Sequence, residues 1–362
     1  MKIGILGGGQ LARMIALAGI PLGARFVVLD PSADAGATEC ADLVQGQYDD
    51  TAALDALAAQ VDVVTYEFEN VPQASARYLA QKVPVYPAAD VLEVAQDRLN
   101  EKTLFNQLGI ETPPFAPVSS LAELEAAVAS IGLPAVLKTR TQGYDGKGQA
   151  VIKTADQLAE AWQSIGEVPA ILEGFIQFDR EVSMIAARNL NGDIRFYPVS
   201  ENDHAGGILR VARARAGDPI TPLAQDYTAK LMEHLNYVGV IAVEYFQRGD
   251  QLLANEFAPR VHNSGHWTIE GAECSQFENH VRAVANLPLG STDPVGFGAM
   301  VNLIGDLPSA DQILAIAHCH AHFYGKDPRP GRKVAHIGIR ANTEAERESA
   351  ITAANQLPGA KT

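Results

Sequence analysis

Three consecutive glycines, Gly7-Gly8-Gly9, interrupt the chain directly after an apolar run at residues 2–6. Apolar positions in residues 10–22 then recur with helical spacing, and a second apolar run follows at residues 25–29. Glycine permits the tight turn that joins a strand to a helix. The segment therefore predicts a strand, a turn, a helix and a second strand in immediate succession.

The same alternation continues to about residue 90. Apolar runs at residues 61–66 and 83–86 follow helical stretches at residues 51–60 and 73–82. Strands that are separated by helices pair in parallel, because the crossover returns the chain to the same end of the sheet. We therefore predict a Rossmann-like parallel sheet of four strands in an N-terminal domain, residues 1–98.

A smaller α+β unit is expected next, at residues 99–180. It begins with a helix near residues 98–108 and a Pro-rich stretch at 112–117, which reads as a boundary. Two further helices are predicted at residues 121–131 and 155–165. The strands predicted around them are residues 135–139, 149–152 and 170–174.

A third domain, residues 181–362, is predicted to hold a larger antiparallel sheet. Long β-like runs surround one amphipathic helix at residues 222–235. These runs are residues 181–190, 193–199, 207–214, 238–247 and 251–259. The fold class is therefore mixed, α/β followed by α+β.

Charge and composition limit the classes of binding partner and site that the sequence favours. Acidic residues outnumber basic ones by 43 to 28, so the formal net charge is −15 and offers no general attraction to nucleic acid or an anionic membrane. No apolar run approaches the roughly 20 residues of a membrane span. Cys40, Cys274 and Cys319 are too far apart to suggest a disulfide framework or a metal motif. We expect a cytoplasmic protein that binds neither nucleic acid nor membrane.

The first glycine segment allows several interpretations. Residues 7–12 fit the pattern G-x-G-x-x-A between a strand and a helix, and Asp30 closes the second strand, as in a dinucleotide site. Backbone N–H groups at a helix N-terminus also suit any other phosphorylated ligand. An NAD(P)-dependent oxidoreductase, another phosphate site and a purely structural turn are all compatible with this segment.

A second glycine-rich segment, residues 143–149, follows the strand-borne Lys138. Three glycines and Lys147 are typical of a flexible loop that covers a triphosphate with N–H groups and positive charge. A solvated hairpin turn would give the same pattern.

Glu244 and Glu256 lie on two adjacent predicted strands whose other residues are mostly apolar. A hairpin brings both carboxylates to one face, where they repel each other and lose hydration unless a counter-ion is present. Mg²⁺ is the natural counter-ion, and Asn255 offers a further oxygen ligand. Solvated strand charges are the alternative.

A polar run follows at residues 258–267. Arg260 supplies a planar fork that matches a carboxylate or bicarbonate, and His262 or Asn263 can hydrogen-bond a remaining oxygen. His262 and His266 also suggest zinc, but no third ligand is evident. A basic cluster at residues 326–333 is a candidate anion site, or an exposed charged turn.

This order of segments resembles the ATP-grasp superfamily, and the motifs are similar to the N5-carboxyaminoimidazole ribonucleotide synthetase family. The motifs are residues 7–11, 66–72, 96–102, 143–149, 255–266 and 324–326, and the resemblance covers residues 1–340. It implies an ATP-dependent carbon–nitrogen ligase of purine biosynthesis, usually a homodimer, which joins bicarbonate to 5-aminoimidazole ribonucleotide with Mg²⁺ as cofactor.

The resemblance also implies a role for individual residues. ATP would contact Arg98, Lys138, Gly143, Tyr144, Asp145, Gly146, Lys147, Gly148, Gln149, Glu173, Gly174, Phe175, Ile176, Glu181, Asn255 and Glu256. Mg²⁺ would be held by Glu244 and Glu256. Bicarbonate would meet Arg260, His262, Asn263 and Lys326. The aminoimidazole nucleotide would meet Gly9, Gln10, Glu67, Tyr144, Asp145, Ser264, Lys326 and Arg332. Asp145, Arg260 and Lys326 would be catalytic, with Asp145 accepting a proton or orienting the amine; His204 is a further candidate.

The implied chemistry suits these residue types. Phosphorylation by ATP would convert bicarbonate to carboxyphosphate, and this anhydride, or CO₂ released from it, would react with the amine. A formate-dependent glycinamide ribonucleotide transformylase is the alternative within the superfamily. A non-catalytic nucleotide-binding or regulatory protein of the same fold is a further alternative, and an NAD(P)-dependent oxidoreductase is the alternative from a different class.

Overall fold

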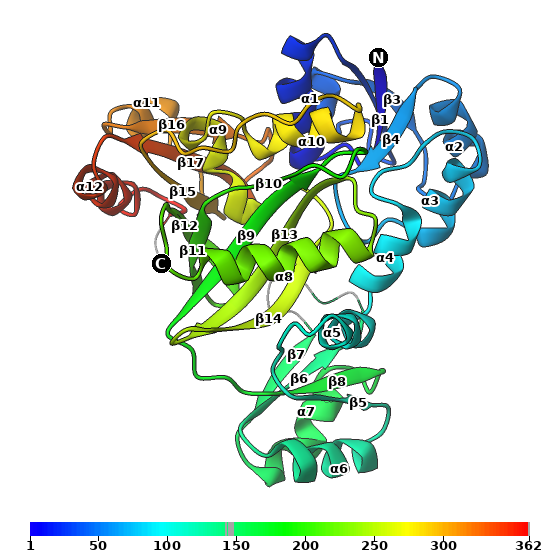
Figure 1. The fold of residues 1–362 in the computed structure, drawn as a ribbon, viewed down its shortest axis with the longest axis vertical. Coiled ribbons are helices and arrows are strands. Elements are labelled where there is room, and N and C mark those ends of the chain that lie inside the picture. The colour runs from blue at the N-terminus through cyan, green and yellow to red at the C-terminus, as the bar shows by residue number, and fades with distance from the viewer. Residues whose placement is uncertain (142, 144–147, 361–362) are drawn as a thin grey trace.

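The computed structural model describes residues 1–141, Gly143 and residues 148–360. Within these residues the strands form three sheets, which Figure 1 shows as an upper N-terminal unit, a large central sheet and a small unit below. The predicted mixed architecture, with a parallel sheet first and antiparallel sheets after it, is confirmed.

The N-terminal sheet is parallel, with the strand order β3-β2-β1-β4. Its strands are β1 (Lys2–Leu6), β2 (Arg25–Asp30), β3 (Asp42–Gln45) and β4 (Val63–Tyr66). The helices of this region are α1 (Gln10–Gly19), η1 (Ile20–Leu22), η2 (Gly36–Glu39), α2 (Thr51–Ala58), α3 (Gln73–Ala80) and α4 (Ala89–Ala95).

One predicted strand of this sheet is wrong, and one observed strand is not predicted. Residues 83–86 contribute only an isolated bridge from Val85 to Val64, because Pro84 and Pro87 lack the N–H groups that a longer ladder needs. The fourth strand is instead β3, an edge strand with only two apolar residues, which is too short for a clear period in the sequence.

Helix α5 (Arg98–Gln107) leads to the small sheet, whose order is β5-β8-β6-β7. Its antiparallel strands are β5 (Phe115–Val118), β6 (Ala135–Thr139), β7 (Gln149–Ile152) and β8 (Ala170–Gly174). Its helices are α6 (Leu121–Ile131), η3 (Ala155–Gln157) and α7 (Leu158–Ser164). Strand β5 is not predicted by the sequence because it lies in the Pro-rich stretch that reads as a boundary.

The large sheet has nine antiparallel strands, in the order β14-β13-β9-β11-β12-β15-β17-β16, with β10 beside β9. Its strands are β9 (Arg180–Arg188), β10 (Ile194–Phe196), β11 (Val199–Ala205), β12 (Ile208–Arg215), β13 (Gly239–Arg248), β14 (Gln251–Ala258), β15 (Phe297–Ile304), β16 (Cys319–Phe323) and β17 (Lys333–Ala341). Its helices are α8 (Thr221–His234), η4 (Asn263–Gly265), α9 (Thr268–Gly271), α10 (Gln276–Val284), α11 (Ala310–Leu314) and α12 (Glu344–Ala354).

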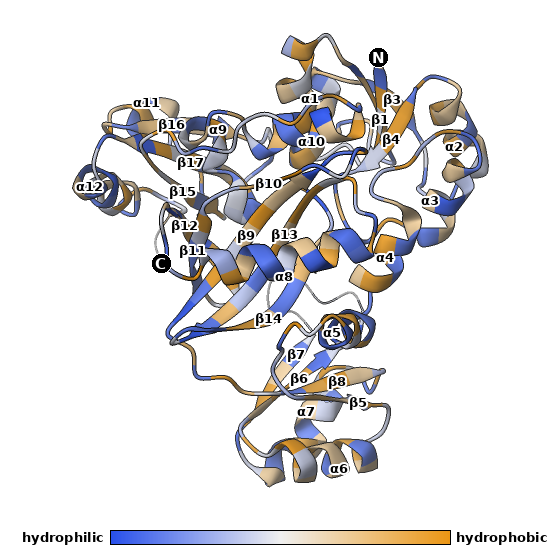
Figure 2. Ribbon diagram, viewed as in Figure 1, coloured by the Kyte–Doolittle hydropathy of each residue, from blue (hydrophilic) through white to orange (hydrophobic). Residues whose placement is uncertain are grey.

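Helix α8 crosses one face of this sheet (Figure 1). Figure 2 shows hydrophobic residues along β9 and β13 and an alternation of hydrophilic and hydrophobic residues on α8. The apolar side of α8, including Leu231 and Met232, is buried in the same hydrophobic cluster as Met184 and Ala186 of β9. Burial of such a stripe is what holds an amphipathic helix on a sheet.

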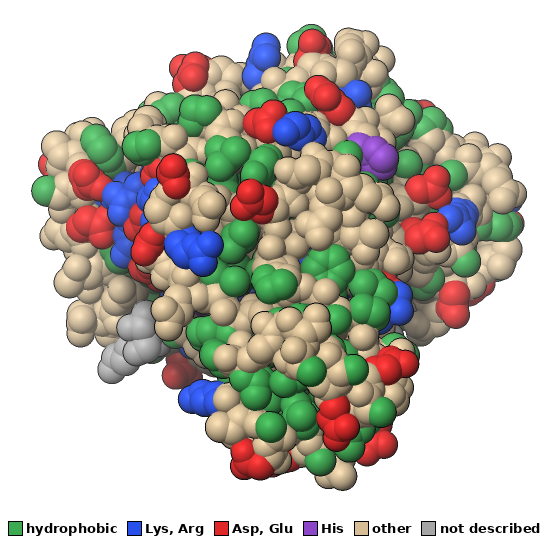
Figure 3. Space-filling model, turned by 60° about the horizontal axis from the view of Figure 1, so that its bottom comes forward, with side chains coloured by type: hydrophobic (Ala, Val, Ile, Leu, Met, Phe, Trp, Pro, Cys, Tyr) green, Lys and Arg blue, Asp and Glu red, His purple; other side chains and the backbone are tan. Residues whose placement is uncertain are grey.

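Ion pairs fasten the C-terminal helix to the large sheet. Arg213 of β12 pairs with Glu348 of α12 at 3.1 Å, and Arg215 pairs with Glu344 at 2.5 Å. The guanidinium of Arg347 is buried and donates to the carbonyl of Ala214. On the face drawn in Figure 3, basic and acidic side chains lie next to one another in the same way.

The N-terminal sheet and the large sheet share one hydrophobic core. Ile3 and Val28 of the first belong to the same cluster as Ile185 and Val240 of the second. His280 of α10 crosses this boundary, because its Nδ1 accepts the backbone N–H of Val240 while its Nε2 lies 2.9 Å from Thr65 Oγ1. The ring is therefore neutral with its proton on Nε2, and burial lowers the pKa of His280 to about 4.

This histidine predicts a stability change with pH. The folded pKa lies below the unfolded value, so the stabilisation is complete above about pH 6.5 and is lost as the pH falls toward 4, with a slope of roughly 1 kcal/mol per pH unit. His280→Gln keeps an acceptor for Val240 and a donor for Thr65 but cannot titrate. Urea unfolding between pH 4 and 7 is expected to give a shallower slope for the variant; equal slopes would contradict the prediction.

Candidate active site

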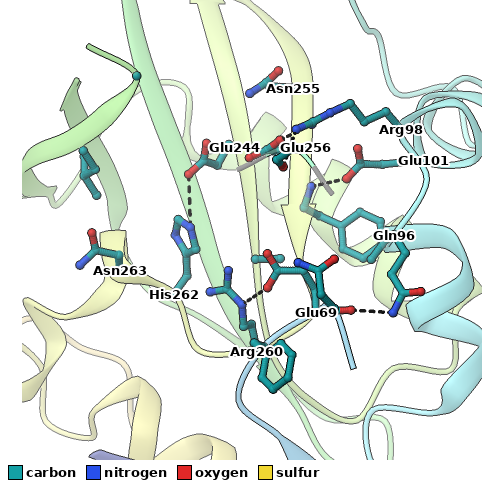
Figure 4. Close-up of a pocket in the computed structure, with 18 of the residues that line it drawn as sticks. Glu69, Gln96, Arg98, Glu101, Glu244, Asn255, Glu256, Arg260, His262 and Asn263 are labelled. Atoms are coloured by element: carbon teal, nitrogen blue, oxygen red, sulfur yellow. Dashed lines mark hydrogen bonds and ion pairs between the residues drawn. The ribbon is translucent and has the colours of Figure 1, made fainter. Parts of the chain in front are cut away.

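A cavity of about 860 Å³ lies where the three sheets meet. Its walls come from the loops after β1 and β4, the start of α5, the small sheet and the strands β13 and β14 (Figure 4). Charged and amide side chains from distant parts of the sequence converge on it, as the labelled residues in Figure 4 show.

Of the predicted site residues that the structure describes, most face this cavity. Those that line it are Gln10, Glu67, Arg98, Lys138, Gly143, Gln149, Glu181, Glu244, Asn255, Glu256, Arg260, His262 and Asn263. The predicted residues that are not among the described lining residues are Gly9, Gly148, Glu173, Gly174, Phe175, Ile176, Ser264, Lys326 and Arg332. Tyr144, Asp145, Gly146 and Lys147 lie outside the described residues.

Glu244 and Glu256 face each other across the β13–β14 hairpin, as a register pair at a β-bulge. Burial and the charge of Glu256 raise the pKa of Glu244 to about 7. Burial also opposes ionisation of Glu256, but Arg98 outweighs it and lowers the pKa of that carboxyl. The pair therefore has one carboxylate with a strong cationic partner and one without, and this second carboxylate calls for a further cation.

Arg98 owes its position to the start of helix α5. The side chain of Asp97 caps the helix through the N–H groups of Leu99 and Asn100, and it also binds the guanidinium of Arg140 at 2.6 Å. Arg98 then reaches Glu256 Oε2 at 2.7 Å and the carbonyl of Gly143 at 2.9 Å. The helix N-terminus thus joins the small sheet to the acidic pair.

Lys138 of β6 also lines the cavity. Its Nζ lies 3.0 Å from Glu173 Oε2 and 3.4 Å from Asn255 Oδ1. Glu173, which is predicted to contact ATP, is buried and paired with Lys138 in this structure. Phe175, expected beside it, is largely exposed.

Arg260 follows β14 and forms an ion pair with Glu69 from the loop after β4. The charge of Arg260 overcomes the effect of burial and lowers the pKa of Glu69. The carbonyl of Glu69 in turn accepts an N–H from Gln96 at 2.7 Å (Figure 4). The guanidinium is therefore held in a fixed orientation at the cavity wall, with its remaining N–H groups able to bind a planar anion.

His262 and Asn263 continue the same wall. The backbone N–H of Ser264 donates to His262 Nδ1, and His262 Nε2 lies 3.5 Å from Glu244 Oε1. Burial and the charge of Arg260 lower the pKa of His262 well below its usual value, so the ring is neutral. Asn263 exchanges two amide hydrogen bonds with the buried Asn302, at 3.0 and 2.6 Å.

The first glycine turn is occupied by the protein's own carboxylates. Glu67 accepts the N–H groups of Gly9 at 2.5 Å and Ala12 at 2.9 Å, and Asp30 accepts that of Gly8 at 2.9 Å. These are donors that a dinucleotide pyrophosphate would use at a helix N-terminus. The interpretation of this segment as an NAD(P) site is therefore not supported.

Two predicted residues near this turn have partners of their own. Lys326 Nζ donates to Gln10 Oε1, and burial together with the charge of Arg332 lowers the pKa of Lys326. Glu181, which is predicted to contact ATP, lies 3.1 Å from Nδ1 of His204, which also lines the cavity.

Several residues of the cavity wall carry no prediction from the sequence. Glu69 lies in the 66–72 motif, where only Glu67 has an implied role, and its proximity to Arg260 depends on contacts between residues 191 positions apart. Arg140 also lines the cavity without a prediction, whereas Tyr324 and Lys333, which line it too, belong to the predicted 324–326 motif and to the basic cluster at residues 326–333. No local sequence pattern predicts that Arg140 lines the same cavity as Arg98.

The described residues offer neither a zinc site nor a membrane-spanning helix. They contain no group of three or more His, Cys, Asp or Glu side chains placed to hold a metal ion, so the zinc interpretation of His262 and His266 gains no third ligand. None of the helices in the same ranges is long and apolar enough to cross a membrane.

Comparison with known protein families divides the chain into three matches. Residues 1–96 match the ribonucleotide synthetase preATP-grasp domain, and residues 103–277 match the ATP-grasp domain. Residues 298–350 match the phosphoribosylaminoimidazole carboxylase C-terminal domain.

Individual relatives are similar over almost the whole chain. An N5-carboxyaminoimidazole ribonucleotide synthase from Pseudomonas aeruginosa is 53% identical, covering 99% of each chain. The crystal structure of an N5-carboxyaminoimidazole ribonucleotide synthetase from Thermus thermophilus is 52% identical with a TM-score of 0.94, covering 98% of each chain. An Aspergillus clavatus synthase in complex with ADP and 5-aminoimidazole ribonucleotide is 29% identical with a TM-score of 0.91, covering 98% of this chain and 99% of that chain.

The glycine turn provides a stability test. Gly7 has φ +100°, and a Cβ there would lie 2.5 Å from Glu67 Cγ. Gly7→Ala is expected to lower the free energy of unfolding by about 2–4 kcal/mol, from backbone strain and overpacking together. Gly23→Ala is the matched control, because Gly23 also has positive φ but open space around it, so about 1 kcal/mol is expected there. Equal losses in urea unfolding would contradict the proposed close approach of Glu67.

Proposed function

Because the chain belongs to the N5-carboxyaminoimidazole ribonucleotide synthase family of ATP-grasp ligases, it carboxylates 5-aminoimidazole ribonucleotide with ATP in purine biosynthesis, and we propose that the central cavity holds its substrates. The observation that carries this placement is the meeting of the Glu244–Glu256 pair, the cations Arg98 and Lys138, and the Arg260 fork on one cavity.

The phosphates of ATP would lie between Arg98 and Lys138. The two cations reach the cavity from different elements, Arg98 from α5 and Lys138 from β6. The carbonyl of Gly143, the first residue of the glycine-rich segment, accepts an N–H of Arg98. Negative charge develops on the phosphoryl oxygens during transfer. Two cations that are already held in position stabilise this charge without a further cost of reorganisation in the transition state.

Mg²⁺ would be held by Glu244 and Glu256, with Asn255 as a further oxygen donor. The donor set fits a hard cation: the carboxylates are paired in register, and burial together with the charge of Glu256 raises the pKa of Glu244, so a cation is needed to keep both ionised. When bound, the ion would neutralise phosphate charge and orient the γ-phosphoryl group. Arg98 would keep Glu256 ionised throughout.

Bicarbonate would bind at Arg260, beside His262 and Asn263. Attack of a bicarbonate oxygen on the γ-phosphorus forms the new O–P bond and breaks the bond to ADP, which gives carboxyphosphate. The amine of the aminoimidazole nucleotide then forms a C–N bond to this carbon, or to CO₂ released from it, as phosphate leaves and the nitrogen loses a proton. Glu69 would keep Arg260 facing the reacting carbonyl group.

The aminoimidazole nucleotide would occupy the end of the cavity near Gln10 and Glu67, with Lys326 and Arg332 close by. Lys326 already contacts Gln10, so an anionic group of the nucleotide bound there would meet the ammonium of Lys326. The pKa of this ammonium is lowered by burial and by the charge of Arg332. Asp145 would accept a proton from the amine or orient it. We also propose a cytoplasmic homodimer with domains at residues 1–98, 99–180 and 181–362.

Substrate identity is tested by ADP release. The purified protein with Mg-ATP and bicarbonate is expected to release ADP rapidly only when 5-aminoimidazole ribonucleotide is added, in a bicarbonate-dependent way. Glycinamide ribonucleotide with formate is the comparison, because it is the substrate pair of the sister transformylases. Activity with that pair instead would move the chain to the sister family and leave the ATP site unchanged.

The cation site is tested by the magnesium dependence of turnover. Glu244→Gln and Glu256→Gln each remove one charged ligand, so the Mg²⁺ concentration for half-maximal activity should rise at least about tenfold, the cost of a weakened ionic contact. Glu233→Gln, on the exposed side of α8, is the matched control. Unchanged magnesium dependence in both cavity variants would remove Glu244 and Glu256 as ligands.

A further inference from the structure

Lys102 is a buried cation to which neither the reaction nor the substrates assign a role. It lies on α5, one turn after Arg98, and its side chain is only 1% exposed. Its Nζ lies 3.3 Å from Glu173 Oε2 and 3.3 Å from the carbonyl of Ala254 on β14. A buried lysine is costly unless its charge is used, because desolvation disfavours the ammonium form.

The carboxylate that Lys102 contacts is also the partner of Lys138. Both ammonium groups approach the same oxygen, Glu173 Oε2, at 3.3 and 3.0 Å. The other oxygen, Oε1, is buried and has no hydrogen-bond partner among the described residues. Burial opposes ionisation of Glu173, but Lys102 and Lys138 outweigh it and hold the pKa of this carboxyl at about 2.

The contacts of this cluster are unequal in number. Two ammonium groups share one carboxylate oxygen, whereas in a simple Lys138–Glu173 pair Lys138 alone would hold it. Lys138 is the more exposed of the two cations, with 12% of its side chain accessible, and it lines the cavity. The ammonium group that faces the cavity therefore shares its carboxylate with a second, buried ammonium group.

We infer that Lys102 is a positioning residue for ATP binding: by sharing the carboxylate of Glu173, it leaves the ammonium of Lys138 free to engage the phosphates. This inference rests on the proposed function, in which Lys138 contacts ATP. Helix α5 then serves the nucleotide twice, directly through Arg98 and indirectly through Lys102.

The test compares the binding of ADP and AMP by calorimetry, with the full-length protein. Lys102→Met keeps the length of the buried side chain and leaves Glu173 paired with Lys138, so no buried charge loses its last partner. ADP is expected to bind about tenfold more weakly, the size of one weakened charge-assisted hydrogen bond, while AMP, which lacks the outer phosphates, changes less than about twofold. Equal weakening of both nucleotides, or of neither, would overturn the inference.

A second variant separates positioning from structural damage. Lys102→Met combined with Glu173→Gln removes both buried charges and releases Lys138, so the ratio of ADP to AMP affinity should return toward that of the parent protein. A ratio that stays low in the double variant would overturn the inference, because Glu173 would then not be the group that restrains Lys138. Using the ratio cancels any contact that Glu173 makes with adenine.

Lys138→Met serves as the reference for the proposed function. If it leaves the ADP-to-AMP ratio unchanged, Lys138 does not contact the phosphates, and the ATP placement and the inference fail together. If Lys138→Met lowers the ratio and Lys102→Met does not, only the role of Lys102 fails.

Discussion

The repulsion between two carboxylates on one buried hairpin is the constraint around which the site is arranged. Glu244 and Glu256 are brought into register by the antiparallel pairing of β13 and β14, which the apolar residues on either side stabilise. A sheet interior cannot hold two such charges without cations nearby. Arg98 meets this need for Glu256, so the start of α5 must lie at the sheet surface, and the small sheet is attached there through Asp97 and Arg140.

Elsewhere in the cavity the charges are paired within the protein before any ligand arrives. Glu69 holds Arg260, and Glu67 and Asp30 occupy the donors of the glycine turn. Such pairing fixes the orientation of each group in advance, so less reorganisation is needed when charge develops on a substrate. It also explains why a dinucleotide-like sequence pattern does not make a dinucleotide site here: the turn is the same, but its donors are already used.

Local periodicity predicted much of the fold, and motif order predicted the family. The β13–β14 hairpin and the facing of its two glutamates follow from alternation and a short turn, which are local properties. The single bridge at Val85 and the edge strand β3 were not predictable in this way, since proline chemistry and a neighbouring strand decide them. The pairs Arg260–Glu69 and Lys102–Glu173 could not be predicted because sequence spacing carries no signal for contacts across the fold.

The contact between Lys326 and Gln10 joins residues 316 positions apart, and Lys333 lines the same cavity as Gln10. Synthesis on the ribosome proceeds from the N-terminus, and early segments fold as they emerge. The glycine turn, α5 and the acidic hairpin are therefore all made well before the residues that complete the cavity. A nascent chain can therefore form the acidic pair and its Arg98 partner early, whereas the proposed substrate cavity stays incomplete until the segment with Tyr324 and Lys333 has been made.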